Sequence, residues 1–297
     1  MRSKSLPIQE PVHKNYIEYI EIQFIHACNL ACKGCATFSE LKHSGYTSWK
    51  QIKKDLVPWL ERLQPECIGV MGGEPFMNPQ LEEVILGLRE LLPNTQIRVP
   101  TNGLLLLKKY HIVELLNDIG NSILKISYHI DDPIIHKAIK KIMNDFTFKP
   151  VTEFGINRWS TANDFKFQIN TPTTFTKSFI GDYDNMKPHN NAPADAFEIC
   201  VAKRCPFLFN GRLYKCSTVG LTPWILEKHN PNQKLWEPYL DKGLGVDCTD
   251  FELKKFLNNF GKPHAICRQC PSKFDTDSLI EHRKFVVKKG RQLPTAL

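Results

Sequence analysis

The sequence predicts an α/β protein in which a layer or barrel of parallel strands is followed by a small cysteine-rich extension. Two observations lead to this fold class. From Ile17 to about Asn170, segments with strand character alternate with segments of helical period, which is the pattern of a parallel α/β layer or barrel. After Phe197, six of the ten cysteines lie among short aromatic and basic segments, as in a unit organised by a metal.

Six strands and four helices are expected in the first part. Runs of β-branched, aromatic and alternating residues place strands at 17–25, 67–71, 97–101, 123–130, 150–154 and 165–169. Apolar residues three and four positions apart place helices at 48–63, 78–92, 108–120 and 131–146, with Ser48 and Asp131 as plausible caps. Residues 171–196 are rich in Thr, Asn, Pro and Asp without a sustained period, which predicts a linker or loop.

The composition excludes a membrane-spanning or low-complexity chain. Of the 297 residues, 42% are apolar and 24% charged, and no apolar run approaches the roughly 18 residues of a membrane span. The basic N-terminus meets Pro7, Glu10 and Pro11 where a signal peptide would need an apolar stretch, so a cytoplasmic protein is expected. Because thiols stay reduced in that compartment, ten cysteines indicate metal or redox chemistry rather than disulfides.

The net charge of +8 is unevenly distributed. Residues 281–297 carry five basic side chains against Glu281, so this tail contributes about half of the excess. A solvated terminus explains such a tail better than a nucleic-acid-binding arm, and a nucleic-acid partner is therefore not expected.

Three cysteines form the strongest motif. Cys28, Cys32 and Cys35 follow the first strand with the spacing Cys-x3-Cys-x2-Cys. Thiolates select zinc or iron-sulfur clusters, and a loop that offers three of them leaves one corner of the metal site open for chemistry. The alternative is a structural zinc loop whose fourth ligand is His26 or His43.

This loop resembles the signature of the radical S-adenosylmethionine (SAM) superfamily, and further landmarks follow in the family's order. Gly72-Gly73-Glu74 looks like the glycine-rich segment that meets the SAM amino group, and Glu74 can accept a hydrogen bond from an ammonium. The turn at Asn102 after the third strand is similar to the family's turn at that place. The resemblance implies a partial (β/α)6 barrel and a 4Fe-4S cluster on the three cysteines, with SAM on the open iron.

Further positions are assigned by the same resemblance. Ser127 and His129 lie where the family often contacts the SAM ribose and carboxylate. Gly34 stands where many members have an aromatic residue against adenine, and in this chain its backbone would make that contact.

Strand alternation predicts a polar barrel interior. Lys125, Ser127 and His129 share one face of the fourth strand, while its apolar residues suit packing against helices. The same reasoning directs Glu21, Gln23, Arg98, Glu153, Lys166 and Gln168 inward. Such an interior favours a polar or zwitterionic small-molecule substrate over a lipid. Lys125, His129, Glu153 and Cys248 are the candidate catalytic side chains.

The later cysteines predict a second metal site. Cys200, Cys216, Cys267 and Cys270 resemble the twitch form of the SPASM extension, which holds one auxiliary 4Fe-4S cluster; Gly211 fits as the turn of a hairpin that presents Cys216. Cys205 and Cys248 are alternative ligands or functional thiols, Cys67 is expected to be a buried small hydrophobe, and a zinc ribbon is the alternative reading. The expected division is an arm at 1–16, the barrel at 17–175, a linker at 176–196, the auxiliary domain at 197–280 and a basic tail at 281–297.

The resemblance implies reductive cleavage of SAM, with an electron from a donor such as flavodoxin or ferredoxin, and hydrogen abstraction from a substrate carbon. The arrangement looks like single-auxiliary-cluster proteins of carbohydrate and cell-surface biosynthesis, with a relation to aminocyclitol dehydrogenases. Dehydrogenation or epimerisation of a sugar-like substrate is therefore the first hypothesis. A peptide-modifying maturase is the second. A non-catalytic zinc protein that binds nucleic acid is the alternative from another class.

Overall fold

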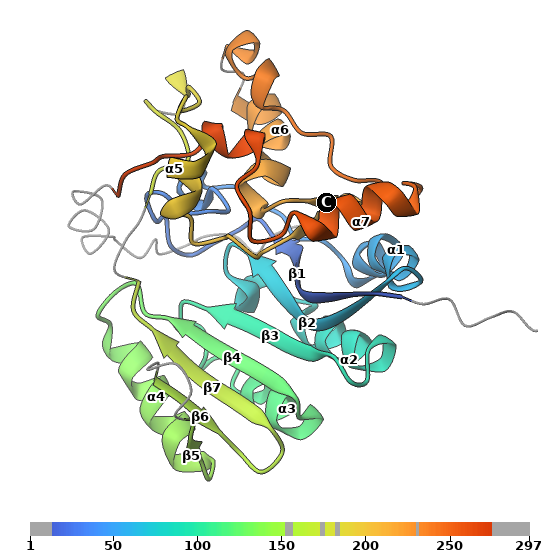
Figure 1. Ribbon diagram of the computed structural model, residues 1–297. Coiled ribbons are helices and arrows are strands. Elements are labelled where there is room, and N and C mark those ends of the chain that lie inside the picture. Colours follow the sequence, from blue (N-terminus) through green and yellow to red (C-terminus); the bar gives the residue numbers. More distant parts are fainter. Residues whose placement is uncertain (1–13, 152–156, 173–175, 182–184, 230–231, 275–297) are drawn as a thin grey trace, which may run out of the picture.

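The computed structural model describes residues 14–151, 157–172, 176–181, 185–229 and 232–274. The predicted basic tail, Glu153 and most of the N-terminal arm lie outside these residues. One nine-stranded mixed sheet with the order β5-β6-β7-β4-β3-β2-β1-β8-β9 runs through the molecule (Figure 1). Its six central strands, from β7 to β8, are parallel to one another. The predicted α/β fold with a partial barrel is confirmed.

The first part of the chain alternates strands and helices as predicted. Its parallel strands are β1 (Asn15–Ile25), β2 (Leu63–Gly72), β3 (Gln96–Thr101), β4 (Ser122–Ser127) and β7 (Phe165–Asn170). The helices between them are α1 (Trp49–Leu60), α2 (Leu81–Leu91), α3 (His111–Ile119) and α4 (Pro133–Asp145). Ser48 caps α1 as expected, whereas the α4 cap is Asp132 rather than Asp131.

Of the strand predicted at 150–154, residues 150 and 151 are described by the structure, and they do not form a parallel barrel strand. β5 (Lys149–Pro150) has two residues, and it pairs antiparallel with β6 (Asn157–Ser160), which in turn pairs antiparallel with β7. The reason is the short connection: a turn closed by the Asp164 N–H and the Thr161 carbonyl joins β6 to β7, and a parallel pair would need a crossover. The sixth parallel strand is instead β8.

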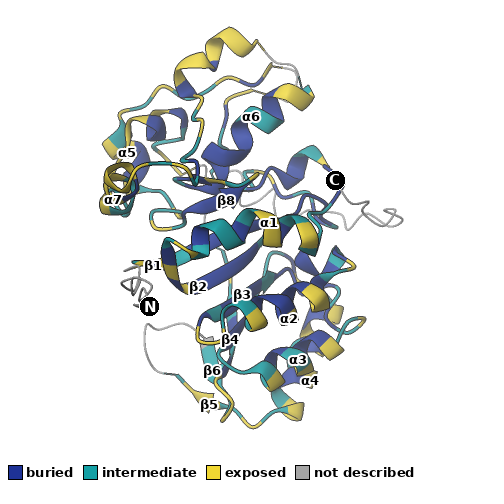
Figure 2. Ribbon diagram, turned by 90° about the vertical axis from the view of Figure 1, so that its right-hand side faces the viewer, coloured by how far each residue is buried: buried dark blue, intermediate teal, exposed yellow. Residues whose placement is uncertain are grey.

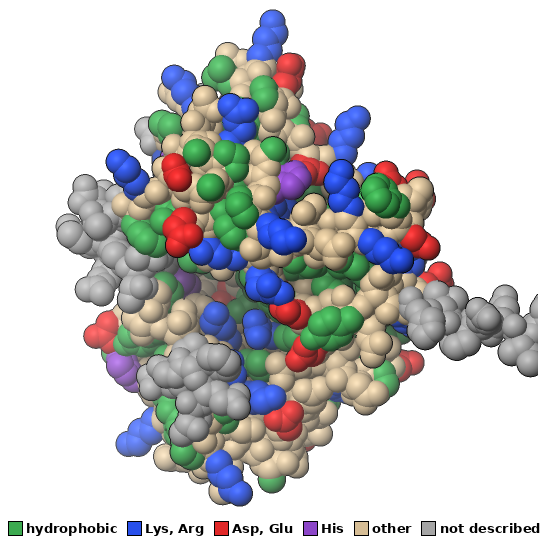
Figure 3. Space-filling view, in the orientation of Figure 1, with side chains coloured by type: hydrophobic (Ala, Val, Ile, Leu, Met, Phe, Trp, Pro, Cys, Tyr) green, Lys and Arg blue, Asp and Glu red, His purple; other side chains and the backbone are tan. Residues whose placement is uncertain are grey.

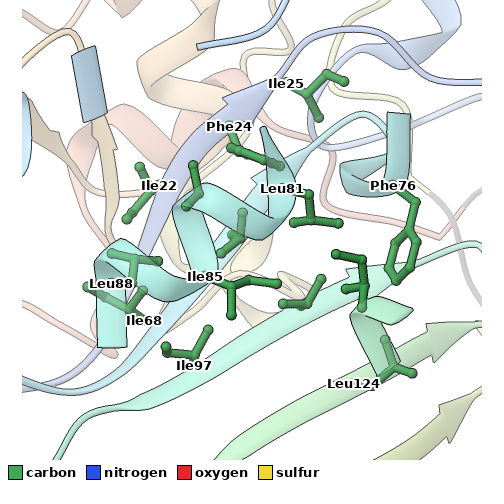
Figure 4. Close-up of a cluster of buried hydrophobic side chains, with 14 of the residues drawn as sticks. Ile22, Phe24, Ile25, Ile68, Phe76, Leu81, Ile85, Leu88, Ile97 and Leu124 are labelled. Atoms are coloured by element: carbon green, nitrogen blue, oxygen red, sulfur yellow. The ribbon is translucent and has the colours of Figure 1, made fainter. Parts of the chain in front are cut away.

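The four helices cover one face of the sheet and bury a continuous apolar layer. Burial concentrates on the strands and on the inward faces of the helices (Figure 2). In Figure 4, Leu81, Ile85 and Leu88 of α2 lie against Phe24 and the neighbouring strands, and all four side chains are at most 1% exposed. The opposite, open face of the sheet is therefore left to polar side chains.

The cysteine-rich part continues the same sheet. β8 (Phe207–Phe209) lies parallel to β1 and forms a hairpin with β9 (Arg212–Tyr214). The turn residues Asn210 and Gly211 have φ angles of 49° and 72°, so the predicted Asn-Gly turn is confirmed. Its helices are α5 (Pro193–Glu198), α6 (Ser217–His229) and α7 (Asp250–Asn258).

Short 3-10 helices complete the described elements: η1 (Ser39–Leu41), η2 (Pro75–Met77), η4 (Gln233–Leu235), η5 (Glu237–Tyr239) and η6 (Ala265–Gln269). α5 begins inside the segment predicted as a linker. Within the ranges described, no helix is both long and apolar enough to cross a bilayer.

Candidate functional site

The three-cysteine loop leaves the carboxyl end of β1 and holds its thiols close together. The Leu30 N–H donates to the Cys28 Sγ at 3.4 Å, and the Cys35 Sγ lies 3.2 Å from the Thr37 hydroxyl oxygen. Burial, followed by the neighbouring Cys35 and Cys28 thiols, raises the pKa of Cys32 far above its usual range. The three predicted ligands therefore belong to one compact group.

The backbone at position 34 of this loop favours glycine. Its φ is +72°, and a Cβ there would lie 3.0 Å from the backbone carbonyl of Thr176. The Gly34 N–H also donates to the buried carboxylate of Glu40 at 3.3 Å. The left-handed conformation and the close approach explain why no aromatic residue occupies this position.

The Gly72-Gly73 pair fastens the cysteine loop to β2. The Gly73 N–H donates to the Ile25 carbonyl at 2.8 Å, and the next N–H donates to the Ala27 carbonyl at 2.9 Å. A Cβ on Gly72 or Gly73 would lie 2.0 or 2.1 Å from these carbonyl oxygens. Both glycines are therefore required by the approach of two chain segments, independently of any ligand.

The Glu74 carboxylate accepts hydrogen bonds from within the protein, which the sequence did not predict. It is 1% exposed and accepts hydrogen bonds from the Thr101 hydroxyl at 2.7 Å, the Asn102 N–H at 2.7 Å and the Phe76 N–H at 3.0 Å. Burial raises its pKa to about 7. Three protein donors leave the carboxylate acceptor capacity for one more, so its contact with the SAM amino group stays a prediction.

The ends of the next strands complete the rim around the cysteine loop. The Asn102 amide donates to the Asn29 side chain at 2.7 Å and lies 4.0 Å from the Cys28 Sγ. Ser127 is the last residue of β4, and His129 follows two residues later. The residues predicted to bind SAM stay predictions: Gly34, Gly72, Gly73, Glu74, Asn102, Ser127 and His129.

The chemistry of the donors fits a thiolate-bound cluster. Thiols of this group accept an N–H and lie beside a hydroxyl and an amide, the kind of outer contact that orients sulfur ligands. His26 and His43, the candidate zinc ligands, instead place their rings 4.3 and 4.4 Å from the Trp224 ring. No set of three His, Cys, Asp or Glu side chains in the described ranges is arranged to hold a single metal ion.

The second cysteine group gathers in the extension. Cys200 follows α5, Cys216 follows β9, Cys267 lies in η6, and Cys270 is the residue directly after η6. Burial is the main reason why the pKa values of Cys200, Cys216 and Cys270 rise, and other thiols of the group add to each rise. The fold therefore brings the four predicted auxiliary ligands near one another.

The open face of the sheet is polar, as strand alternation predicts. The pairing between neighbouring strands places Glu21 of β1, Arg98 of β3 and Lys166 of β7 in one row across the sheet. Gly69 of β2 and Ile123 of β4 are the positions between them. Lys125 of β4 lies in the next row, where it pairs with Gln168, and Gln168 pairs with Arg158 of β6.

Residues 22–154 match the family model described as the radical SAM superfamily. The chain contains a radical SAM domain. Mycofactocin maturase MftC of Mycobacterium tuberculosis is 36% identical over 63 residues, 21% of this chain and 16% of that protein. A probable GTP 3′,8-cyclase of Sulfolobus acidocaldarius is 30% identical over 128 residues, 43% of this chain and 39% of that protein. The chain thus spans less than half the length of these relatives.

A solved structure supports the fold beyond the matched segment. The crystal structure of BtrN in complex with AdoMet and 2-DOIA superposes with a TM-score of 0.51 at 16% identity, over 86% of this chain and 94% of that chain. At this identity the similarity concerns the fold, and it includes the part that follows the radical SAM domain.

The two remaining thiols have separate surroundings. Cys205 lies close to the Glu21 carboxylate on the open face of the radical SAM domain, and also near Cys200 and Cys216 of the second cysteine group. Cys248 lies elsewhere, beside the end of α1, where the Arg62 guanidinium donates to its Sγ at 3.2 Å and to its carbonyl at 2.7 Å. The structure therefore places Cys248, a candidate catalytic residue and auxiliary ligand, outside both cysteine groups. Cys67 is buried in β2, as expected.

Two residues of the open face were not identified from sequence. Tyr19 lies beside Glu21, and its ring centroid is 4.8 Å from the Arg98 guanidinium carbon. Alternation with Glu21 along β1 is the signal that would have found it. Arg158 was missed because strand β6 was not predicted.

Proposed function

We propose that the protein is a radical SAM enzyme that removes a hydrogen atom from a polar, sugar-like substrate, with dehydrogenation or epimerisation as the outcome. The observation that carries this proposal is the compact group of Cys28, Cys32 and Cys35 at the carboxyl end of a parallel sheet with a polar open face. When bound by such a cluster, SAM supplies a 5′-deoxyadenosyl radical that abstracts hydrogen from carbon.

The residues of the chain would hold and orient the reactants. Cys28, Cys32 and Cys35 would ligate the 4Fe-4S cluster, and the Leu30 N–H and the Asn102 amide would orient the Cys28 sulfur. The SAM-binding residues proposed above line the same rim. Lys125 and His129 belong to the substrate side of this rim, while Glu153 stays a prediction outside the described residues.

The auxiliary cysteines are proposed to bind a second 4Fe-4S cluster. Cys200, Cys216, Cys267 and Cys270 form a group of four thiols, which is a complete protein ligand set for such a cluster. Held by these four thiols, such a cluster would supply an acceptor for the electron that a dehydrogenation leaves after the substrate has lost a hydrogen atom and a proton. An external donor such as flavodoxin or ferredoxin would supply the electron that cleaves SAM.

Anaerobic reconstitution tests both cluster assignments. We expect brown protein with about eight iron and eight sulfide per chain, assuming two 4Fe-4S clusters, and 5′-deoxyadenosine after addition of dithionite and SAM. Cys32→Ser and Cys267→Ser should each lose about four irons. The matched controls Cys67→Ser and Cys248→Ser should keep the full content. Stoichiometric zinc, no visible absorbance and salt-sensitive binding to RNA or DNA would instead support the nucleic-acid alternative.

Two experiments separate the finer possibilities. Deuterium from heavy water in the product, lost on Cys205→Ala, would indicate epimerisation, because a thiol must then return a hydrogen atom; its absence would indicate oxidation. The second candidate function is a peptide maturase, which the similarity to MftC over 63 residues favours. Formation of 5′-deoxyadenosine that depends on a short peptide rather than a sugar would support it.

A further inference from the structure

Three cationic side chains lie on neighbouring strands of the open face. Lys125 of β4 is connected through Gln168 of β7 to Arg158 of β6 in one register row, and Arg98 of β3 lies in the adjacent row on the same face. Figure 3 looks onto this face, where Lys and Arg side chains gather around a hollow near its centre. The three cations therefore lie within two adjacent rows on one face of the sheet.

The protein leaves this charge largely unneutralised. Within the described chain, the acidic side chain that faces Lys125 is Glu21. That carboxylate lies near both Arg98 and Lys125, so one acidic side chain faces two of the three cations. Lys166, at the lower edge, has its own partner in Asp164 at 3.1 Å and does not compete for Glu21.

The guanidinium groups of Arg98 and Arg158 also have hydrogen-bond donors without an acceptor in the described part of the chain. The Nε atoms of Arg98 and Arg158 are buried and have no hydrogen-bond partner in the part of the chain that the structure describes. Arg158 donates through Nη2 to the neutral side-chain oxygen of Gln168 at 3.3 Å. A buried donor without an acceptor is unfavourable, and an anion on this face would satisfy it.

We propose that Arg98, Lys125 and Arg158 bind a phosphoryl group of the substrate, so that the substrate is a phosphorylated polar molecule. This inference rests on the proposed function and names its substrate class. Guanidinium forks match phosphate oxygens, and three cations complement its two negative charges. A neutral sugar would leave these charges without a counterion, and an aminocyclitol would add a further positive charge.

The position of the three cations separates this subsite from the SAM site. They lie on β3, β4 and β6, whereas the cysteine loop follows β1 and is fastened to the end of β2. Lys125 precedes Ser127 by two residues on β4, so it points to the same face one row deeper in the sheet. The carboxylate of SAM would be held at the rim, above this row.

Calorimetric titration of inorganic pyrophosphate into the reconstituted protein, with and without saturating SAM, tests the proposal. We expect binding that persists with SAM present and weakens at least tenfold in Arg98→Gln and in Arg158→Gln. The control Lys140→Gln removes the same charge from the exposed surface of α4 and should bind as the wild type does. Equal affinity in all four proteins, or displacement of pyrophosphate by SAM, would overturn the proposal.

A second series identifies the group that is recognised. Glucose 6-phosphate should bind more tightly than glucose or glucosamine, and this preference should disappear in Arg158→Gln. A melting temperature of Arg158→Gln close to that of the wild type verifies that the variant is folded. Tighter binding of glucosamine would contradict the proposal. Because binding is measured without turnover, a protein that cleaves SAM but ignores pyrophosphate disproves only the phosphoryl subsite. A protein that binds pyrophosphate but forms no 5′-deoxyadenosine disproves only the proposed activity.

Discussion

The backbone N–H of Asn102 donates a 2.7 Å hydrogen bond to the carboxylate of Glu74, which ties the end of β3 to the end of β2. Glu74 also accepts from Thr101 and Phe76, so one buried side chain satisfies three donors beneath the proposed SAM site. The glycines that precede it hold the cysteine loop, and the loop is therefore anchored to two strands in succession.

Glu74→Ala should strongly destabilise the protein. The substitution leaves three buried donors without an acceptor, which predicts a loss of at least about 2 kcal/mol in the free energy of unfolding. Urea unfolding under anaerobic conditions measures it. Glu90→Ala, on the exposed side of α2, is the control and should stay within about 0.5 kcal/mol of the wild type. Equal stability of the two variants would contradict this role.

Gly34→Ala should disturb the cysteine loop more than a positive φ alone explains. Gly211 also has φ +72°, but a Cβ there would come no closer than 3.5 Å to the Asp55 carboxylate, against 3.0 Å to backbone at Gly34. Gly211→Ala should therefore lose only the conformational term of about 1–2 kcal/mol. Gly34→Ala should lose more and retain less iron after reconstitution. Similar iron content and stability in the two variants would refute the steric argument.

Gly69 makes room for Tyr19 on the open face. A Cβ at Gly69 would lie 2.0 Å from the Tyr19 hydroxyl oxygen and 2.8 Å from its ring carbon Cζ. We expect Gly69→Ala to lower the melting temperature, because the ring must leave its contact with Arg98. Tyr19→Phe removes the nearer atom and should restore part of the loss in the double variant. A double variant as unstable as the sum of the two single variants would argue against this contact.

Glu21 should make the protein less stable as the pH rises. Its folded-state pKa is about 7 against an ordinary 4.5, because burial disfavours the charged carboxylate. The folded state therefore holds a proton that the unfolded state releases, and stability falls between about pH 4.5 and 7 before it levels. In Glu21→Gln this contribution disappears, so the stability of the wild type relative to the variant should decrease from pH 5 to pH 8.

Anaerobic thermal melts at several pH values check this difference. Glu74 has the same direction of shift and is present in both proteins, so it cancels in the comparison. A difference that grew in favour of the wild type with rising pH would contradict the assignment.

The sequence allowed prediction of the features that depend on local pattern. Alternation and helical period placed β1 to β4, β7 and the four helices, and the Asn210-Gly211 dipeptide located the β8–β9 hairpin. The two cysteine groups were recognisable because their spacing is itself the signal. These features need no knowledge of long-range contacts.

Other features depend on contacts between distant segments and were missed. The antiparallel direction of β6 follows from the short turn between β6 and β7, which no residue pattern in the sequence indicated. The separation of Cys248 from the other thiols follows from Arg62, 186 residues away. The hydrogen bonds of the Glu74 carboxylate could not be predicted from sequence, because two of its donors, Thr101 and Asn102, lie at the end of β3.

The parallel pairing of β8 with β1 has a mechanical consequence. Glu21 and Ile22 of β1 pair with Phe207 and Leu208, so the β8–β9 hairpin, after which Cys216 follows, is joined to the strand that leads into the cysteine loop. A rotation of the extension away from the barrel would break the backbone hydrogen bonds between β1 and β8. The β1–β8 pairing therefore fixes the position of the extension relative to the cysteine loop.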